Sequence, residues 1–153
     1  MYNLAEPKRP IDAPPARSPA SDLEAEQEKN LILIVEDDFV LRSAVAELLT
    51  GEGYDVECAA DGLEAFIRLD SNTRKPSVIL LDISMPRMDG VRFRALQKSL
   101  PAIAKIPVIA VTGTVKAQKS GFDQRDFAET FFKPLDIPGL LRAIRTLTTG
   151  ERE

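Results

Sequence analysis

The chain has 153 residues, 44% of them hydrophobic, and a net charge of -4. This length allows one domain with a sizeable core. The chain has no apolar run near the ~20 residues of a membrane span, and it has no secretory signal. Its net negative charge argues against nucleic-acid binding. The chain has no histidine, which excludes histidine-ligated zinc and a Ser-His-Asp triad. Any histidine chemistry must therefore come from a partner.

Residues 1–29 differ in composition from the rest of the chain. They hold five of the eleven prolines, among Ala, Ser and Glu, and few apolar residues. Such a segment cannot bury enough apolar surface to fold. We therefore expect a disordered leader over 1–29, one folded domain over 30–148 and a short tail over 149–153.

From residue 30 onward, short apolar runs alternate with amphipathic stretches. The runs Leu31–Val35, Tyr54–Cys58, 77–82, Val108–Val111 and the pair before Lys133 predict strands. Apolar residues at helical spacing predict a helix after each strand. The second, third and last of these helices begin at Asp61, Asp89 and Asp136, and the fourth covers roughly Val115–Asp126.

This alternation predicts the α/β fold class. We expect a (βα)5 doubly wound, parallel, five-stranded sheet in the order 2-1-3-4-5. Its crevice should lie between the first and third strands.

Polar residues follow four of the predicted strands: Glu36-Asp37, Asp82, Thr112 and Lys133. Ligands of open α/β sheets bind beyond the carboxyl ends of the strands, so these side chains should share one pocket. Three carboxylates repel one another, which favours a hard divalent cation such as Mg2+. Asp82 is the best nucleophile for an acyl phosphate, while Thr112 and Lys133 can bind phosphoryl oxygens.

The sequence resembles the receiver domain of two-component response regulators over about residues 30–148. Four stretches carry the resemblance: 32–38, 80–90, 108–113 and 131–134. It implies a flavodoxin-like fold in which Asp82 accepts a phosphoryl group from the phosphohistidine of a sensor histidine kinase or a histidine phosphotransfer protein. By the same likeness, Glu36, Asp37, Asp82 and the backbone carbonyl of Ser84 hold Mg2+. Thr112 matches the switch hydroxyl and Lys133 the phosphate-binding lysine.

The chain departs from the family pattern at Thr130, where the family usually carries Tyr or Phe. In a strand, Phe132 shares the face of Thr130 and Phe131 that of Lys133, so neither replaces the aromatic. We therefore expect altered aromatic gating with phosphorylation retained. Residues 121–129 also lack the family's usual Gly-Ala-acid pattern.

Six residues follow Leu147, so we expect a stand-alone cytoplasmic receiver without an output domain. Its signal should leave through the face around Lys116–Asp126 and Asp136–Arg145. Phosphorylation should alter affinity for a downstream protein or for a second copy, as a phosphorylation-dependent homodimer. We expect no enzymatic activity beyond self-phosphorylation and slow self-dephosphorylation.

Two alternatives use the same residues. A phosphorylation-independent scaffold or adaptor with a receiver fold draws its support from Thr130. A phosphohydrolase of the haloacid-dehalogenase type also uses an aspartyl nucleophile, but it needs a second acid two residues later. Ser84 stands there instead, which disfavours turnover of external phosphomonoesters.

Overall fold

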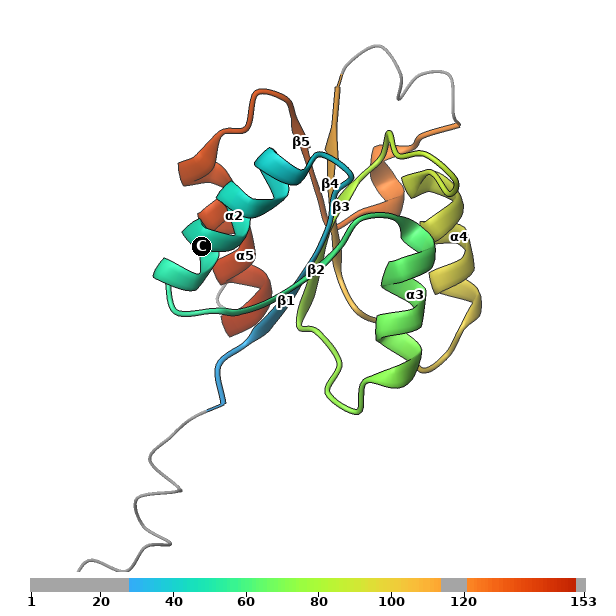
Figure 1. Ribbon diagram of the computed structural model, residues 1–153, viewed down its shortest axis with the longest axis horizontal. Helices are drawn as coiled ribbons and strands as arrows, with labels where there is room; N and C mark the ends of the chain where they lie inside the picture. Colours follow the sequence, from blue (N-terminus) through green and yellow to red (C-terminus); the bar gives the residue numbers. More distant parts are fainter. Residues whose placement is uncertain (1–27, 114–120, 151–153) are drawn as a thin grey trace, which may run out of the picture.

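A parallel sheet forms the centre of the molecule, with helices on both faces (Figure 1). The computed structural model describes residues 28–113 and 121–150. The strand order is β2-β1-β3-β4-β5, which confirms the predicted fold class and order. The strands are β1 Leu31–Val35, β2 Asp55–Ala59, β3 Val78–Asp82, β4 Val108–Thr112 and β5 Glu129–Phe132.

Four α-helices lie within the described ranges. Helices α2 (Phe39–Gly51) and α5 (Ile137–Thr149) cover one face of the sheet, and α3 (Gly62–Ser71) and α4 (Gly90–Ser99) cover the other (Figure 1). Each begins at an aspartate whose carboxylate accepts a backbone N–H of the first turn: Asp38, Asp61, Asp89 and Asp136. The three aspartates predicted as helix starts are confirmed.

The predicted helix over 115–126 is wrong for its second half. Gly121 adopts the left-handed conformation with φ 77°, which ends a right-handed helix. After it, Gln124–Asp126 forms only a 3-10 turn, capped by Asp123. Residues 114–120 lie outside the described part of the chain, so the first half of this prediction, and the matching part of the predicted output face, is untested.

The core consists of two layers, one on each side of the sheet. Alternate residues of β1, such as Leu33 and Ile34, point into opposite layers. Strands β1, β3 and β4 are buried along their whole length, and each fully buried aliphatic side chain stabilises the fold by about 1.5–3 kcal/mol. The carboxyl ends of these strands are therefore firmly held.

The observed strand bounds lie close to the predicted ones. Strand β2 begins and ends one residue later than predicted, and β3 starts at Val78 instead of at residue 77. Helix α5 extends to Thr149 and ends at Gly150, which has φ 73°. Within 28–113 and 121–150, no helix has both the length and the apolar character needed to cross a membrane.

Candidate functional site

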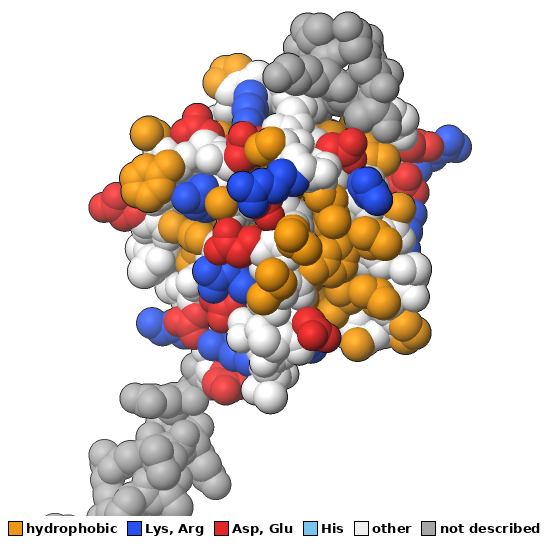
Figure 2. All heavy atoms as spheres, turned by 45° about the vertical axis from the view of Figure 1, so that its right-hand side comes forward, with side chains coloured by type: hydrophobic (Ala, Val, Ile, Leu, Met, Phe, Trp, Pro, Cys, Tyr) orange, Lys and Arg blue, Asp and Glu red, His pale blue; other side chains and the backbone are white. Residues whose placement is uncertain are grey.

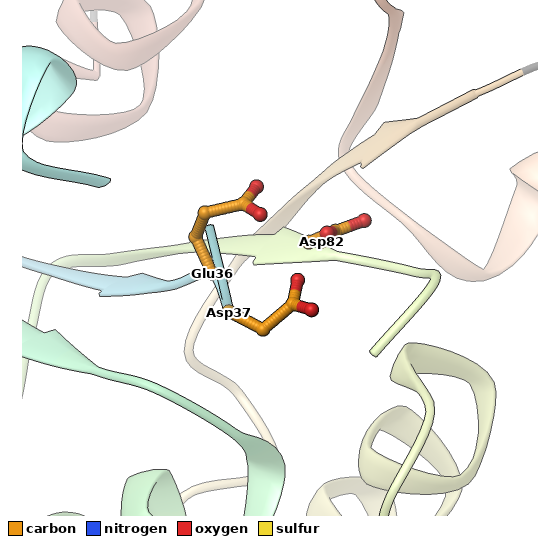
Figure 3. Close-up of side chains that lie close together, drawn as sticks. All are labelled: Glu36, Asp37 and Asp82. Atoms are coloured by element: carbon orange, nitrogen blue, oxygen red, sulfur yellow. The ribbon is translucent and has the colours of Figure 1, made fainter. Parts of the chain in front are cut away.

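Three carboxylates meet where β1 and β3 end. Val35 pairs with Leu81 across these adjacent strands, so the residues that follow Val35 lie beside Asp82 at the strand ends. Glu36, Asp37 and Asp82 each offer a carboxylate oxygen, and these oxygens all lie within 4.8 Å of one another. Figure 3 shows the three side chains converging on one point beyond the strand ends. The structure thus brings together the predicted acidic residues.

Backbone and side-chain hydrogen bonds fix the position of the acidic pair. Glu36 N–H donates to the carbonyl of Ala59 at 3.1 Å, and Glu36 Oε1 accepts from Asp38 N–H at 3.1 Å. Arg42 Nη1, one turn into α2, donates to the Glu36 carbonyl at 2.6 Å and to the Asp37 carbonyl at 3.5 Å. Glu36 is buried, whereas Asp37 is exposed.

Lys133 places its ammonium group beside two of the acids. Its Nζ lies 3.4 Å from Glu36 Oε2 and 3.4 Å from Asp82 Oδ2. Its backbone N–H donates to the carbonyl of Thr112 at 2.9 Å, which joins the ends of β4 and β5. The lysine predicted from the sequence therefore lies in the acidic cluster.

Burial and like charges perturb the ionisation of this cluster. Desolvation, followed by the charge of Asp82, raises the pKa of Glu36 to about 8. Burial disfavours the charged form of Lys133, but Asp82 and Glu36 outweigh it and raise its pKa. Near neutral pH the metal-free site therefore favours either a proton on Glu36 or an added cation.

A small apolar hollow, open to solvent, lies beside the acids. Glu36 and Asp82 border it together with side chains from α2, the sheet and the segment before α5, namely Leu41, Val45, Leu80, Val111 and Leu135. These side chains offer no hydrogen bonds to a carboxylate. They account for the desolvation that raises the pKa of Glu36.

The loop after β3 packs closely against Asp82 and Ile83. Ser84 N–H donates to Asp82 Oδ1 at 3.0 Å, and Gly90 N–H donates to the carbonyl of Ile83 at 2.9 Å. A Cβ on Gly90 would lie 2.7 Å from Ile83 Cα and 2.8 Å from the carbonyl oxygen of Asp82. Only glycine lets α4 begin this close to the phosphoacceptor candidate.

A second contact holds the far side of this loop. Arg87, which has φ 66°, donates from Nη1 to Asp61 Oδ2 at 3.2 Å. Met88 packs on Gly62, where a Cβ would approach its sulfur to 3.0 Å. The start of α3 therefore supports the loop that carries Ser84.

Thr112 lies at the end of β4, which pairs with β3, and Thr130 lies on the neighbouring β5. Thr112 is buried at the end of β4, and its hydroxyl donates to the carbonyl of Gly113 at 3.1 Å. Ala110 pairs with Thr130, so Thr130 lies on the same face of the sheet as Thr112. Thr130 Oγ1 is buried without a hydrogen-bond partner among the described residues. The metal-ligand role of the Ser84 carbonyl stays a prediction.

Arg42 and Asp61 are positioning residues that the sequence analysis missed. The sequence pattern predicts a solvent-exposed side chain for Arg42, because a basic residue on an amphipathic helix usually faces water. The position of Arg42, about one helical turn after the acidic pair, could have indicated that its side chain reaches back to the carbonyls of the loop. Asp61 was predicted only as a helix start, and its bond to Arg87 depends on a loop conformation that periodicity does not reveal.

Comparison with known proteins agrees with this geometry. The family model of the response regulator receiver domain matches residues 32–145. The chain belongs to the response regulator receiver family. Membership supports a phosphoacceptor role in two-component signalling, and receiver domains act as signalling switches.

Curated relatives of this receiver domain are longer proteins. The gliding motility regulatory protein of Myxococcus xanthus is 34% identical over 119 residues, which are 76% of this chain and 15% of that protein. Response regulator MprA of Mycobacterium sp. (strain KMS) is 32% identical over 117 residues, or 76% of this chain and 49% of that protein. The chain thus spans about half or less of these two relatives.

Solved receiver domains share the fold. The signal receiver domain of a signal transduction histidine kinase from Syntrophus aciditrophicus has a TM-score of 0.68 and 28% identity, covering 81% of this chain and 93% of that chain. Chemotaxis response regulator CheY4 of Vibrio cholerae has a TM-score of 0.68 and 26% identity, covering 78% and 98%.

Proposed function

We propose that Asp82 accepts a phosphoryl group from the phosphohistidine of a sensor histidine kinase or a histidine phosphotransfer protein. The convergence of Glu36, Asp37 and Asp82, with Lys133 Nζ 3.4 Å from Asp82 Oδ2, carries this proposal. The 153 residues include no histidine, which supports a donor imidazole on a partner protein.

The transfer uses groups that lie close together in the structure. An Asp82 carboxylate oxygen attacks phosphorus, a P–O bond forms, and the P–N bond to the donor imidazole breaks. The imidazole leaves with the bonding electron pair and takes up a proton. Lys133 binds a phosphoryl oxygen, since its ammonium already lies beside Asp82 and can stabilise the charge of the transition state.

The donor set fits Mg2+. Its three carboxylates offer the oxygen ligands that Mg2+ prefers, and it is partly open through the exposed Asp37. Desolvation by burial, followed by the charge of Asp82, raises the pKa of Glu36, and a bound cation would favour the ionised form of this carboxyl. We propose Glu36, Asp37, Asp82 and the Ser84 carbonyl as the protein ligands. Bound there, the ion offsets the charge that the acids and the phosphoryl oxygens bring together.

Switching is proposed to begin at Thr112. Its hydroxyl now donates to Gly113, a weak local bond that a phosphoryl oxygen on Asp82 can replace. Thr130, on the same face, supplies a small side chain where the family usually has an aromatic, and its hydroxyl has no hydrogen-bond partner within 28–113 and 121–150. We propose that Thr112 therefore moves without an aromatic gate, and that the output face includes Asp136–Arg145.

Exposed apolar side chains flank the site and support docking of a protein donor. Phe39 and Val40 at the start of α2 are exposed, as is Phe132 just before Lys133. Apolar surface beside a reactive group is typical of a binding site for another protein. We propose that the histidine-bearing partner contacts these side chains.

Intact mass after incubation with Mg2+ and a small acyl-phosphate donor tests the proposal. Addition of one phosphoryl group is expected for the natural chain, and none for Asp82→Asn or for a metal-free sample. Asp70→Asn, an exposed acid on α3, is the matched control and should be phosphorylated normally. If a folded, Mg2+-bound protein accepts nothing from the small donor or from any phosphohistidine protein, the phosphorylation-independent scaffold replaces this proposal.

A further inference from the structure

The outer sides of α3 and α4 form an apolar surface that the proposed phosphoacceptor site does not use. Leu63 and Ile67 of α3 are 52% and 60% exposed, and Leu96 and Leu100 at the end of α4 are 41% and 45% exposed. Residues four apart lie on the same side of a helix. Figure 2 shows hydrophobic side chains gathered on the molecular face that carries these two helices. We call these four residues the α3–α4 surface.

The two helices form one platform. Phe66 of α3 and Phe93 of α4 pack together with ring centroids 4.7 Å apart, and Ala65, Leu69 and Phe93 belong to the same buried layer. The α3–α4 surface is thus held in place by the core beneath it. Exposed apolar side chains on a rigid base are typical of a protein interface.

The charges on the two helices are complementary. Helix α3 carries Glu64, Arg68 and Asp70, a net charge of -1, while α4 carries three basic residues and no acid, a net charge of +3. Glu64 pairs with Arg68 within α3 at 3.0 Å, which leaves Asp70 as the acid available to another chain. On α4, Lys98 pairs with Asp126 at 2.6 Å and Arg94 donates to the Asp126 carbonyl, which leaves the exposed Arg92 as the available base. Packing α3 against an α4 therefore joins opposite charges, and packing α4 against α4 joins like charges.

We propose that the α3–α4 surface binds a second copy of this chain, with α3 of each copy packed on α4 of the other. A two-fold interface of this kind is self-complementary, because each copy supplies both halves. Leu63 and Ile67 of one copy would then cover Leu96 and Leu100 of the other, and the same contacts form twice. The proposal needs no phosphoryl transfer, since none of Glu36, Asp37 and Asp82 takes part.

Sedimentation velocity of the unphosphorylated, metal-free chain over a wide concentration range tests this dimer. A reversible monomer–dimer equilibrium is expected. Ile67→Lys should weaken it about tenfold or more, because the new charge is buried in the interface and faces the basic α4 of the other copy. Val40→Lys is the matched control, since Val40 is also an exposed β-branched residue but lies at the start of α2. It should dimerise like the natural chain, as should Asp82→Asn.

Several outcomes overturn the dimer. They are a natural chain that stays monomeric at every concentration, equal weakening by Val40→Lys, and an Ile67→Lys variant that is folded by circular dichroism and dimerises normally. Because Asp82→Asn abolishes phosphorylation in the proposed function but leaves this surface intact, the two proposals fail separately.

Cysteine cross-linking tests which helix meets which. Ile67→Cys and Leu96→Cys are prepared separately, each with Cys58→Ser to remove the natural thiol. On oxidation, a mixture of the two variants should form covalent dimers faster than either variant alone. Faster cross-linking of Leu96→Cys with itself would place α4 on α4 and contradict the proposed arrangement.

Discussion

At the scale of single residues, Arg42 shows how a side chain outside the acidic cluster sets the cluster's position. Its guanidinium contacts the carbonyls of Glu36 and Asp37, so it fixes the backbone from which both carboxylates project. Arg42 also borders the apolar hollow beside Asp82. Groups that orient metal ligands often matter nearly as much as the ligands themselves.

We expect Arg42→Ala to weaken Mg2+ binding about tenfold, because the loop that carries the acidic pair loses its anchor. Isothermal titration calorimetry with Mg2+ measures the change. Arg74→Ala is the matched control: Arg74 pairs with Asp55 at 2.8 Å, at the opposite end of the sheet, and its loss should leave Mg2+ affinity unchanged. Equal affinities for Arg42→Ala and the natural chain would show that the loop holds its shape unaided.

At the scale of elements, the junction between β3 and α4 carries the strictest packing requirement near the site. Gly90→Ala should reduce the free energy of unfolding by about 1–3 kcal/mol, since its Cβ would overlap the backbone of Asp82 and Ile83. Urea unfolding monitored by circular dichroism measures the loss. Gly51→Ala is the control, because a Cβ at Gly51 meets nothing within 4 Å, and alanine favours helix. A Gly90→Ala variant as stable as Gly51→Ala would contradict the close approach described above.

Elements whose signals are local were predictable from the sequence, and those that depend on distant contacts were not. Helix starts can be predicted from a capping aspartate, as at Asp61, Asp89 and Asp136. Buried strands can be predicted from a continuous apolar run, as in β1, β3 and β4. The segment 121–126 was predicted as helix because the left-handed conformation of Gly121 is not visible in an apolar pattern. The convergence of Glu36, Asp82 and Lys133 followed from strand order alone, whereas the anchoring of the loop by Arg42 and Asp61 required the structure.

At the scale of the whole molecule, the like charges of the acidic cluster reduce the stability of the fold. The firmly buried strands hold Glu36 and Asp82 side by side at their ends, although burial and mutual repulsion raise the pKa of Glu36. Lys133 compensates only part of this charge, because it sits 3.4 Å from each of two acids while Asp37 adds a third. A fold that keeps like charges together without full compensation is stabilised when a cation binds.

We therefore expect Mg2+ to raise the free energy of unfolding of the natural chain, by about 1.4 kcal/mol when free Mg2+ is ten times its Kd. Urea unfolding with and without Mg2+ at constant ionic strength measures this effect. Asp37→Asn should abolish most of the increase, since Asp37 is the exposed ligand that completes the cluster. Asp70→Asn, which removes an exposed acid from α3, should keep the full increase. If Mg2+ stabilised Asp37→Asn and the natural chain equally, the ion would be acting elsewhere on the surface, and the acidic cluster would not be its site.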